Sequence, residues 1–217
     1  MTERARVGDE HEGRLRADAR RNRNRLLAAA KAWFATHGPE APAEEIARAA
    51  GVAPGTLYRH FADREALIHA VALDNLNNAL TETRAALAEE SSAWKALVRI
   101  LHQSHELRLI IRLLMAYPAV GEIVKKERDA AQLRHAMIDV FDEVVRRAQA
   151  EGTLRTDVGT GDLAVMFSLL AHPLPIMHTD TAQHASARCT ALLLESLRAG
   201  SEACLPGSPL TPADVGT

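Results

Sequence analysis

The stretch AEEIARAAGVAPGTLYRHFADREAL, residues 43–67, places two short helix-forming segments on either side of a glycine. Its pattern predicts a helix over Ala43–Ala50, a stop at Gly51 and a second helix over Pro54–His60. Proline suits the first position of a helix because its missing N–H would have no partner there. Two short helices joined by a glycine-containing turn are the layout of a helix-turn-helix.

The side chains of this stretch divide into an inward set and an outward set. Two helices cross closely only where the contact residues are small, and Ala47 and Ala50 meet that need. The apolar positions expected to form a small core are Phe34, Ile46, Val52, Leu57 and Phe61. The positions left facing outward on the second helix are Thr56, Tyr58, Arg59 and His60. A helix with such a face fits the major groove of DNA.

Helices are also expected before and after this pair. The first runs from about Ala19 to Thr36 behind the N-cap residue Asp18, and the fourth runs from its cap Asp63 to about Ala88. Arginines cluster at the start of the first helix, at Arg20, Arg21, Arg23 and Arg25. Positive charge is unfavourable at a helix N-terminus, so a negatively charged partner would explain the cost. A solvated basic turn is the alternative.

Composition favours an all-helical protein, because Ala and Leu are abundant and aromatic residues make up only 4% of the chain. The net charge is −2, yet ten Lys or Arg face six Asp or Glu between Arg14 and Glu65, so the basic region is local. The two cysteines, Cys189 and Cys204, lack metal or redox spacing. We find no signal-type apolar segment and no run long enough to cross a membrane, and we expect a cytoplasmic protein.

The remaining chain reads as further helices, near residues 92–106, 107–116, 119–150, 161–171 and 182–199. The expected organisation is a mobile arm over residues 1–17 and a DNA-binding domain over residues 18–80, with the helix-turn-helix at residues 43–62. A larger helical domain over residues 81–200 and a disordered, Pro- and Gly-rich tail over residues 201–217 follow.

Residues 20–80 resemble the DNA-binding domain of the TetR family of transcriptional regulators. The resemblance rests on RNRNRLLAAAKAWFATHG and AEEIARAAGVAPGTLYRHFADREALIHAV. It implies close approach to DNA at Gly55 and phosphate or base contacts from the DNA-binding residues Arg23, Arg25, Ala53, Pro54, Gly55, Thr56, Tyr58, Arg59, His60 and Arg64. Family members often carry a polar residue and a lysine before this glycine, where the present chain has Ala53 and Pro54.

The resemblance further implies a homodimer and a pocket for a small effector in the larger domain. The expected pocket lining is Trp94, Leu97, Leu101, His105, Ile111, Met115, Met137, Phe141, Met166 and Phe167. The expected dimer interface, on the last two long helices, includes Leu163, Leu170, Leu192, Leu193 and Leu197. An ordinary intrachain core is the alternative for both sets.

The sequence therefore predicts a one-component regulator, a repressor that binds a palindromic operator as a dimer and is released by a small, largely apolar ligand. Alternatives are an effector-insensitive DNA-binding or architectural protein, and a carrier or enzyme built on the helical domain. His102, His105, His172 and His178 lack the acidic or cysteine neighbours of a metal site. No metal, cofactor, catalytic residue or membrane partner is expected.

Overall fold

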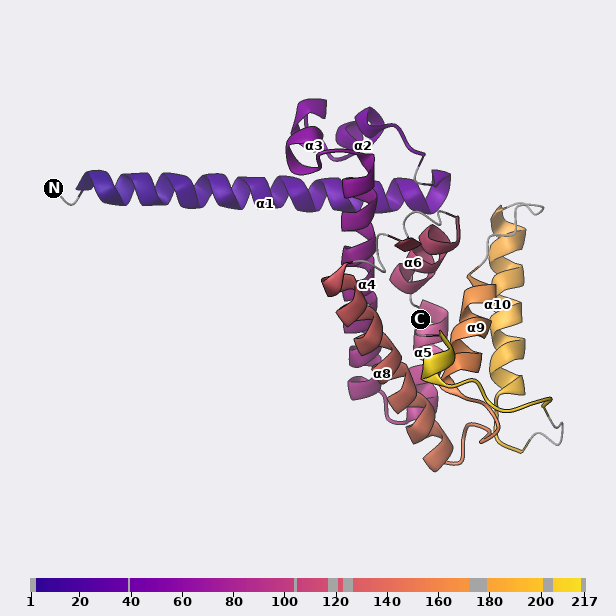
Figure 1. Cartoon of the computed structure of the whole chain (residues 1–217). Helices are drawn as coiled ribbons and strands as arrows, with labels where there is room; N and C mark the ends of the chain where they lie inside the picture. Colours follow the sequence, from indigo (N-terminus) through magenta and orange to yellow (C-terminus); the bar gives the residue numbers. More distant parts are fainter. Residues whose placement is uncertain are drawn as a thin grey trace. The chain divides into compact units, whose positions relative to one another are not determined.

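The computed structural model describes residues 3–38, 40–103, 105–116, 121–122, 127–171, 179–200 and 205–215 (Figure 1). The chain divides into two compact units, Met1–Ala72 and Leu73–Thr217. The division falls within α4 (Arg64–Glu89), eight residues before the boundary at residue 80 that the sequence suggests.

The described residues form helices and no strand, which confirms the all-α fold class. The bounds of the helices besides α4 are α1 (Glu3–His37), α2 (Ala43–Ala49), α3 (Pro54–His60), α5 (Ala93–Gln103), α6 (His105–Ala116), α8 (Arg128–Ala150), α9 (Thr160–Leu170), α10 (Thr179–Ser196) and α11 (Pro212–Val215). An isolated antiparallel bridge joins Leu154 to Arg198.

Helix α1 is much longer than the sequence pattern suggests. Residues 3–17, expected to be an irregular arm, continue the helix toward the N-terminus. Glu, Arg, Ala and Leu are strong helix formers, and they supply much of this segment although it has no apolar face. Because α1 begins at Glu3, Arg20–Arg25 lie about five turns inside it, beyond the reach of the terminal dipole. The dipole argument for a negatively charged partner is therefore wrong.

The N-terminal unit has a small apolar core where α2 and α3 pack on α1. The buried side chains, each at most 5% exposed, are Leu26, Leu27, Ala30, Phe34, Ile46, Ala47, Leu57 and Phe61. Val52, expected in this set, is half-buried at the turn. Fully burying a Leu or Phe side chain contributes about 1.5–3 kcal/mol, so this cluster can hold two seven-residue helices that would not form alone.

In the larger unit, α5 packs on α8 and α10. Helix α9 also packs on α8 and α10. The register of α8 and α9 is tied by a polar contact, because the Thr160 hydroxyl donates to Asp142 Oδ1 at 2.7 Å. Helix α8 begins at Arg128 and not near Ala119, since Glu127 is extended (φ −80°, ψ 124°). The predicted single helix over 119–150 is therefore interrupted at Glu127, while residues 121–122 are helical and residues 119–120 and 123–126 lie outside the described part.

The C-terminal tail is the clearest correction to the sequence reading. Residues 205–215, here called the C-terminal strap, end in α11, which packs on α9 and α8. The Gly161 N–H donates to the Leu210 carbonyl at 2.9 Å, and the Leu210 N–H donates to Asp162 Oδ2 at 3.1 Å. A disordered tail would not make this reciprocal pair of bonds. Residues 201–204 lie outside the described part.

A helix-start signal in the tail could have predicted this order. Thr211 is the N-cap of α11, Pro212 its first residue and Asp214 its third. Asp214 Oδ2 accepts the Thr211 N–H and hydroxyl, each at 2.7 Å. This is the Thr-x-x-acid arrangement that caps helix N-termini, with proline where a helix tolerates it.

Carboxylates hold the strap at several points, which predicts acid sensitivity. The pKa of Asp157 is lowered, first by hydrogen bonds from Arg155 and also by one from the Leu205 backbone, and the pKa of Asp214 is lowered by Thr211. A carboxyl group whose pKa is lowered in the folded state stabilises that state at pH values above its unfolded pKa of about 3.9. This stabilisation is lost as the pH falls through the pKa of the folded state. We expect the Tm difference between the full chain and residues 1–204 to be constant from pH 7 to about pH 5 and to shrink below about pH 4. A difference independent of pH down to about pH 2.5 would contradict this.

Candidate nucleic-acid interface

The turn between α2 and α3 is built on one left-handed glycine. Gly51 has φ +67°, a conformation that costs L-residues strain, and its N–H donates to the Arg48 carbonyl at 3.0 Å. The Val52 N–H then donates to Ala47 at 3.0 Å, which closes the end of α2. Ala53 is extended (φ −66°, ψ 144°) and precedes Pro54 at the first position of α3. The predicted helix-turn-helix geometry is present.

The outer face of α3 carries the predicted polar and aromatic side chains. Tyr58 is 55% exposed and Arg59 is exposed, whereas Thr56 and His60 are half-buried. The Arg59 guanidinium donates to Thr56 Oγ1 at 3.0 Å, which holds it along the helix. Leu57, only 2% exposed, fixes the opposite side of the helix in the core. This face is available for base edges and phosphates.

The start of α3 leaves its backbone accessible. Ala53, Pro54 and Gly55 are all exposed. A Cβ added at Gly55 would meet no atom within 4 Å, so nothing in the described chain requires glycine at this position. A partner that approaches the backbone closely would supply such a requirement, and the predicted close approach to DNA stays a prediction.

The two arginines predicted on α1 lie on different sides of the helix. The Arg23 guanidinium lies 5.1 Å from the centroid of the Phe61 ring, at the C-terminal end of α3. Arg25 is two residues further and so lies about 200° around the helix from Arg23. Both are exposed, and Arg23 adjoins the C-terminal end of the recognition helix.

Arg64 has partners within the chain. Its guanidinium donates to the Ala41 carbonyl at 2.5 Å and lies 3.4 Å from a Glu40 oxygen, so it fastens the connection between α1 and α2. The predicted phosphate contact would have to compete with these bonds. Asp63 caps α4 as expected, since its Oδ1 accepts the Ala66 N–H at 2.7 Å.

The residues predicted to line an effector pocket are mainly core residues. The buried members are Trp94, Leu97, Leu101, Met137, Phe141 and Phe167. Ile111 and Met166 are half-buried, and the side chains of His105 and Met115 lie outside the described part. Close packing explains this result, because Leu97 and Leu101 are at most 1% exposed. The sulfur of Met137 also accepts the Thr83 hydroxyl at 3.7 Å.

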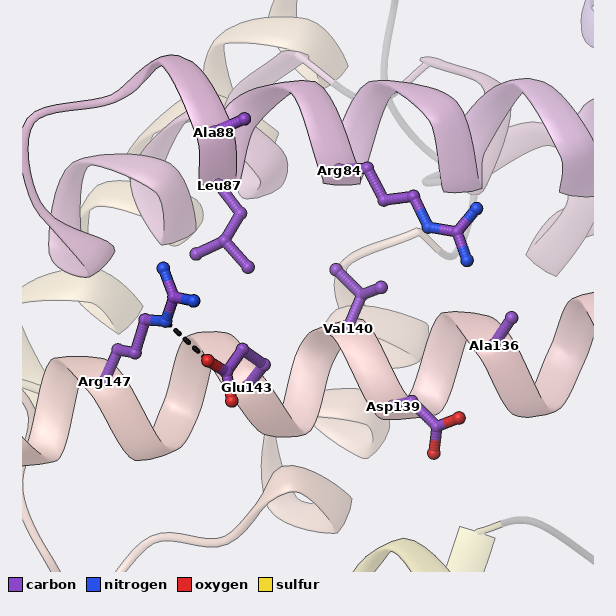
Figure 2. A pocket seen from close by; sticks show the side chains of 8 residues that line it. All are labelled: Arg84, Leu87, Ala88, Ala136, Asp139, Val140, Glu143 and Arg147. Atoms are coloured by element: carbon purple, nitrogen blue, oxygen red, sulfur yellow. Dashed lines mark hydrogen bonds and ion pairs between the residues drawn. The ribbon is translucent and has the colours of Figure 1, made fainter.

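Two hollows in the larger unit are open and lined with charged groups. The first, of about 350 Å³, lies between α4 and α8 (Figure 2) and is lined by Arg84, Leu87, Ala88, Ala136, Asp139, Val140, Glu143 and Arg147. Arg147 is paired there with Glu143 at 2.5 Å. The second, of about 790 Å³, is lined by Glu90, Trp94, Lys95, Val98, Arg99, His102 and Arg198. Trp94 is the one predicted effector residue that lines either of them.

The predicted dimer residues fall into different environments. Leu163 and Leu197 are each 1% exposed within this chain, so they cannot contact a partner and that assignment is corrected. Leu170 and Leu193 are half-buried, whereas Leu192 on α10 is 68% exposed. Sequence reasoning missed Val165 (42%) and Leu169 (67%), one turn apart on α9. Helix α9 is apolar on all sides, so its pattern alone could not separate the two faces.

The described residues contain no helix with the length and apolar character to span a bilayer. They also contain no group of three His, Cys, Asp or Glu side chains that could hold a metal ion.

Comparison with known proteins agrees with this geometry. Residues 26–71 match the family described as bacterial regulatory proteins, tetR family. The transcriptional regulator UidR of Escherichia coli is 28% identical over 153 residues, 67% of this chain and 76% of UidR. The TetR transcription regulatory protein of Mycobacterium vanbaalenii is 30% identical, with a TM-score of 0.62 over 85% of this chain and 99% of that one. A TetR regulator from Streptomyces coelicolor is 26% identical, with a TM-score of 0.64 over 82% and 99%.

The glycine turn, the buried inner face of α3 and its exposed outer face define a helix-turn-helix DNA-binding transcriptional regulator. With these relatives on the same fold, the chain belongs to the TetR family. The similar proteins named here are regulators and not enzymes.

Proposed function

We propose that this protein is a one-component repressor that binds a palindromic operator as a homodimer. The observation that carries the proposal is the exposed face of α3, with Tyr58 and Arg59 outward and Leu57 anchored inward. A two-turn helix reads few base pairs, so useful specificity requires two copies about one DNA turn apart. We propose a cytoplasmic location, because that is where operator DNA would be bound.

A second copy is proposed to bind at α9 and α10. Val165, Leu169 and Leu192 expose apolar side chains on two helices that pack together (Figure 1). Large exposed apolar side chains on adjacent helices favour burial in an interface. A two-fold axis through this face would pair α9 and α10 with their copies in a four-helix bundle.

We also propose that a small, largely apolar molecule releases the repressor from its operator. A ligand shifts the repressor from DNA only if it binds the non-DNA-binding state more tightly, and we propose that it acts by tilting α4. The filled core around Leu97, Leu101 and Phe167 favours a second candidate, a TetR-type regulator that responds to no effector. A ligand-dependent mobility shift, sought with a small-molecule library, separates the two.

Replacement of Arg59 by alanine tests the DNA-binding face. We expect weaker operator binding and a log K against log[salt] slope that is lower in magnitude by about 1, because one phosphate contact is lost. The operator is first recovered by selection from a random DNA pool, where a palindrome is expected. Arg48→Ala is the matched control, since Arg48 is an exposed arginine of the same unit whose guanidinium is 2.6 Å from Glu45. An unchanged affinity and slope for Arg59→Ala would remove Arg59 from the interface.

A further inference from the structure

One face of α1 changes from apolar to basic as the helix leaves the core. The positions on this face follow one another at spacings of four, three, four, three and four residues, which keeps them in line on a helix. They are Arg16, Arg20, Arg23, Leu27, Ala30 and Phe34. The last three are buried against the helix-turn-helix, and the three arginines, here called the arginine stripe, are exposed.

Arg23 joins this stripe to the recognition helix. Its guanidinium lies over the ring of Phe61, 5.1 Å from the centroid, where α3 ends. At 1.5 Å per residue, Arg20 lies about 4.5 Å and Arg16 about 10 Å further along the axis of α1. Within the N-terminal unit, Figure 1 shows α1 continuing well past α2 and α3. The arginine stripe therefore lies on the same side of α1 as α2 and α3, and it continues along α1 beyond the helix-turn-helix.

The opposite face of the same helix differs in kind. Arg14 and Arg21 lie about 160–180° from Arg23. Arg21 is paired there with Asp18, the one acidic residue between Arg14 and Arg25. On the stripe, Arg16 and Arg20 stand four residues apart, a spacing at which like charges destabilise an isolated helix. A polyanion placed on that face would remove the repulsion.

We propose that Arg16, Arg20 and Arg23 bind the sugar–phosphate backbone of DNA that flanks the half-site read by α3. The inference rests on the proposed DNA-binding function and adds a surface to it. Continuity with the recognition helix through Phe61 and the positive charge of the stripe identify DNA as the partner. Such contacts carry no sequence information, so they raise affinity and its salt dependence for every DNA sequence.

The test compares two double variants on a mixed-sequence duplex of about 40 base pairs, a probe chosen because phosphate contacts do not depend on sequence. The stripe variant is Arg16→Gln with Arg20→Gln, and the opposite-face variant is Arg14→Gln with Arg21→Gln. Both remove two positive charges from α1. Glutamine has nearly the helix propensity of arginine, and circular dichroism verifies that α1 persists. Glutamine at position 21 can still donate to Asp18.

We expect the slope of log K against log[salt] to fall in magnitude by about 2 in the stripe variant, about 0.9 for each lost phosphate contact, and to stay unchanged in the opposite-face variant. Equal losses in the two variants would mean that only net charge matters, and no loss in either would mean a solvated stripe. Either outcome overturns the proposal, as does stripe-dependent binding to anionic phospholipid vesicles without an effect on DNA.

The Arg59→Ala variant separates failure of this inference from failure of the proposed function. If Arg59→Ala weakens duplex binding while the stripe variant does not, DNA binding stands and the stripe is excluded from it. If the unaltered chain does not bind duplex DNA in low salt, the proposed function fails first.

Discussion

Replacement of Gly159 by alanine will unseat the C-terminal strap and lower the free energy of unfolding by about 1–3 kcal/mol, the usual cost of forcing an extra carbon into a packed contact. A Cβ at Gly159 would overlap the backbone carbonyl of Leu210. A backbone atom cannot rotate aside, so the strap itself must move. Leu210 would then lose its bonds with Gly161 and Asp162.

The same substitution in a chain of residues 1–204 makes the prediction specific. Without the strap the overlap disappears, so Gly159→Ala should cost only about 1 kcal/mol, because alanine is a poorer N-cap residue than glycine. The difference between the two backgrounds, measured by urea unfolding, is the interaction energy of Gly159 with the strap. Gly121→Ala is the control, because a Cβ there meets nothing within 4 Å. Equal costs for Gly159→Ala in both backgrounds would mean that the strap is not bound in solution.

Substitution of Leu169 and Leu192 by glutamate will convert the proposed dimer to monomer. Burying a leucine side chain contributes about 1.5–3 kcal/mol, and two-fold symmetry counts each position twice, so the loss exceeds about 6 kcal/mol before the cost of burying charge. That corresponds to at least a ten-thousandfold rise in the dimer dissociation constant. Operator affinity should fall with it, since each recognition helix would bind alone.

Sedimentation analysis of the double variant gives the readout. The matched control is Ala150→Glu with Leu205→Glu, which adds the same charge at two exposed positions outside α9 and α10. If the Leu169 and Leu192 variant stays dimeric at low micromolar concentration, the interface lies elsewhere. If the unaltered chain is itself monomeric there, the dimer proposal is wrong, while the stability predicted for the strap is unaffected.

Local chemistry explains why the helix-turn-helix could be predicted to within a residue. Gly51 supplies the left-handed turn and Pro54 starts α3. The apolar residues Leu57 and Phe61, four positions apart, define its inner face. Each of these signals acts over a few residues, so the local sequence is sufficient to specify the helix-turn-helix. The same holds for Tyr58 and Arg59, which are exposed because Leu57 and Phe61 are buried.

Contacts between residues far apart in the chain could not be predicted from local sequence patterns. Arg64 has the right residue type for a phosphate contact, yet it bonds to Ala41, 23 residues away in the chain. Leu163 and Leu192 look alike in sequence, but one is 1% and the other 68% exposed. An apolar pattern predicts that a side chain is buried. It does not show whether the side chain is buried within its own chain or against a partner chain.

The sequence by itself determined the all-helical class, the helix-turn-helix and its outward face, because periodicity, caps and turn residues act between near neighbours. Only the tertiary structure decided that six of the predicted pocket residues are buried in this chain and which leucines of α9 and α10 stay exposed. It also decided that residues 205–215 dock on α9 and that the arginines of α1 divide into two faces, one beside the recognition helix. These outcomes depend on contacts between segments far apart in the chain, which no local pattern specifies.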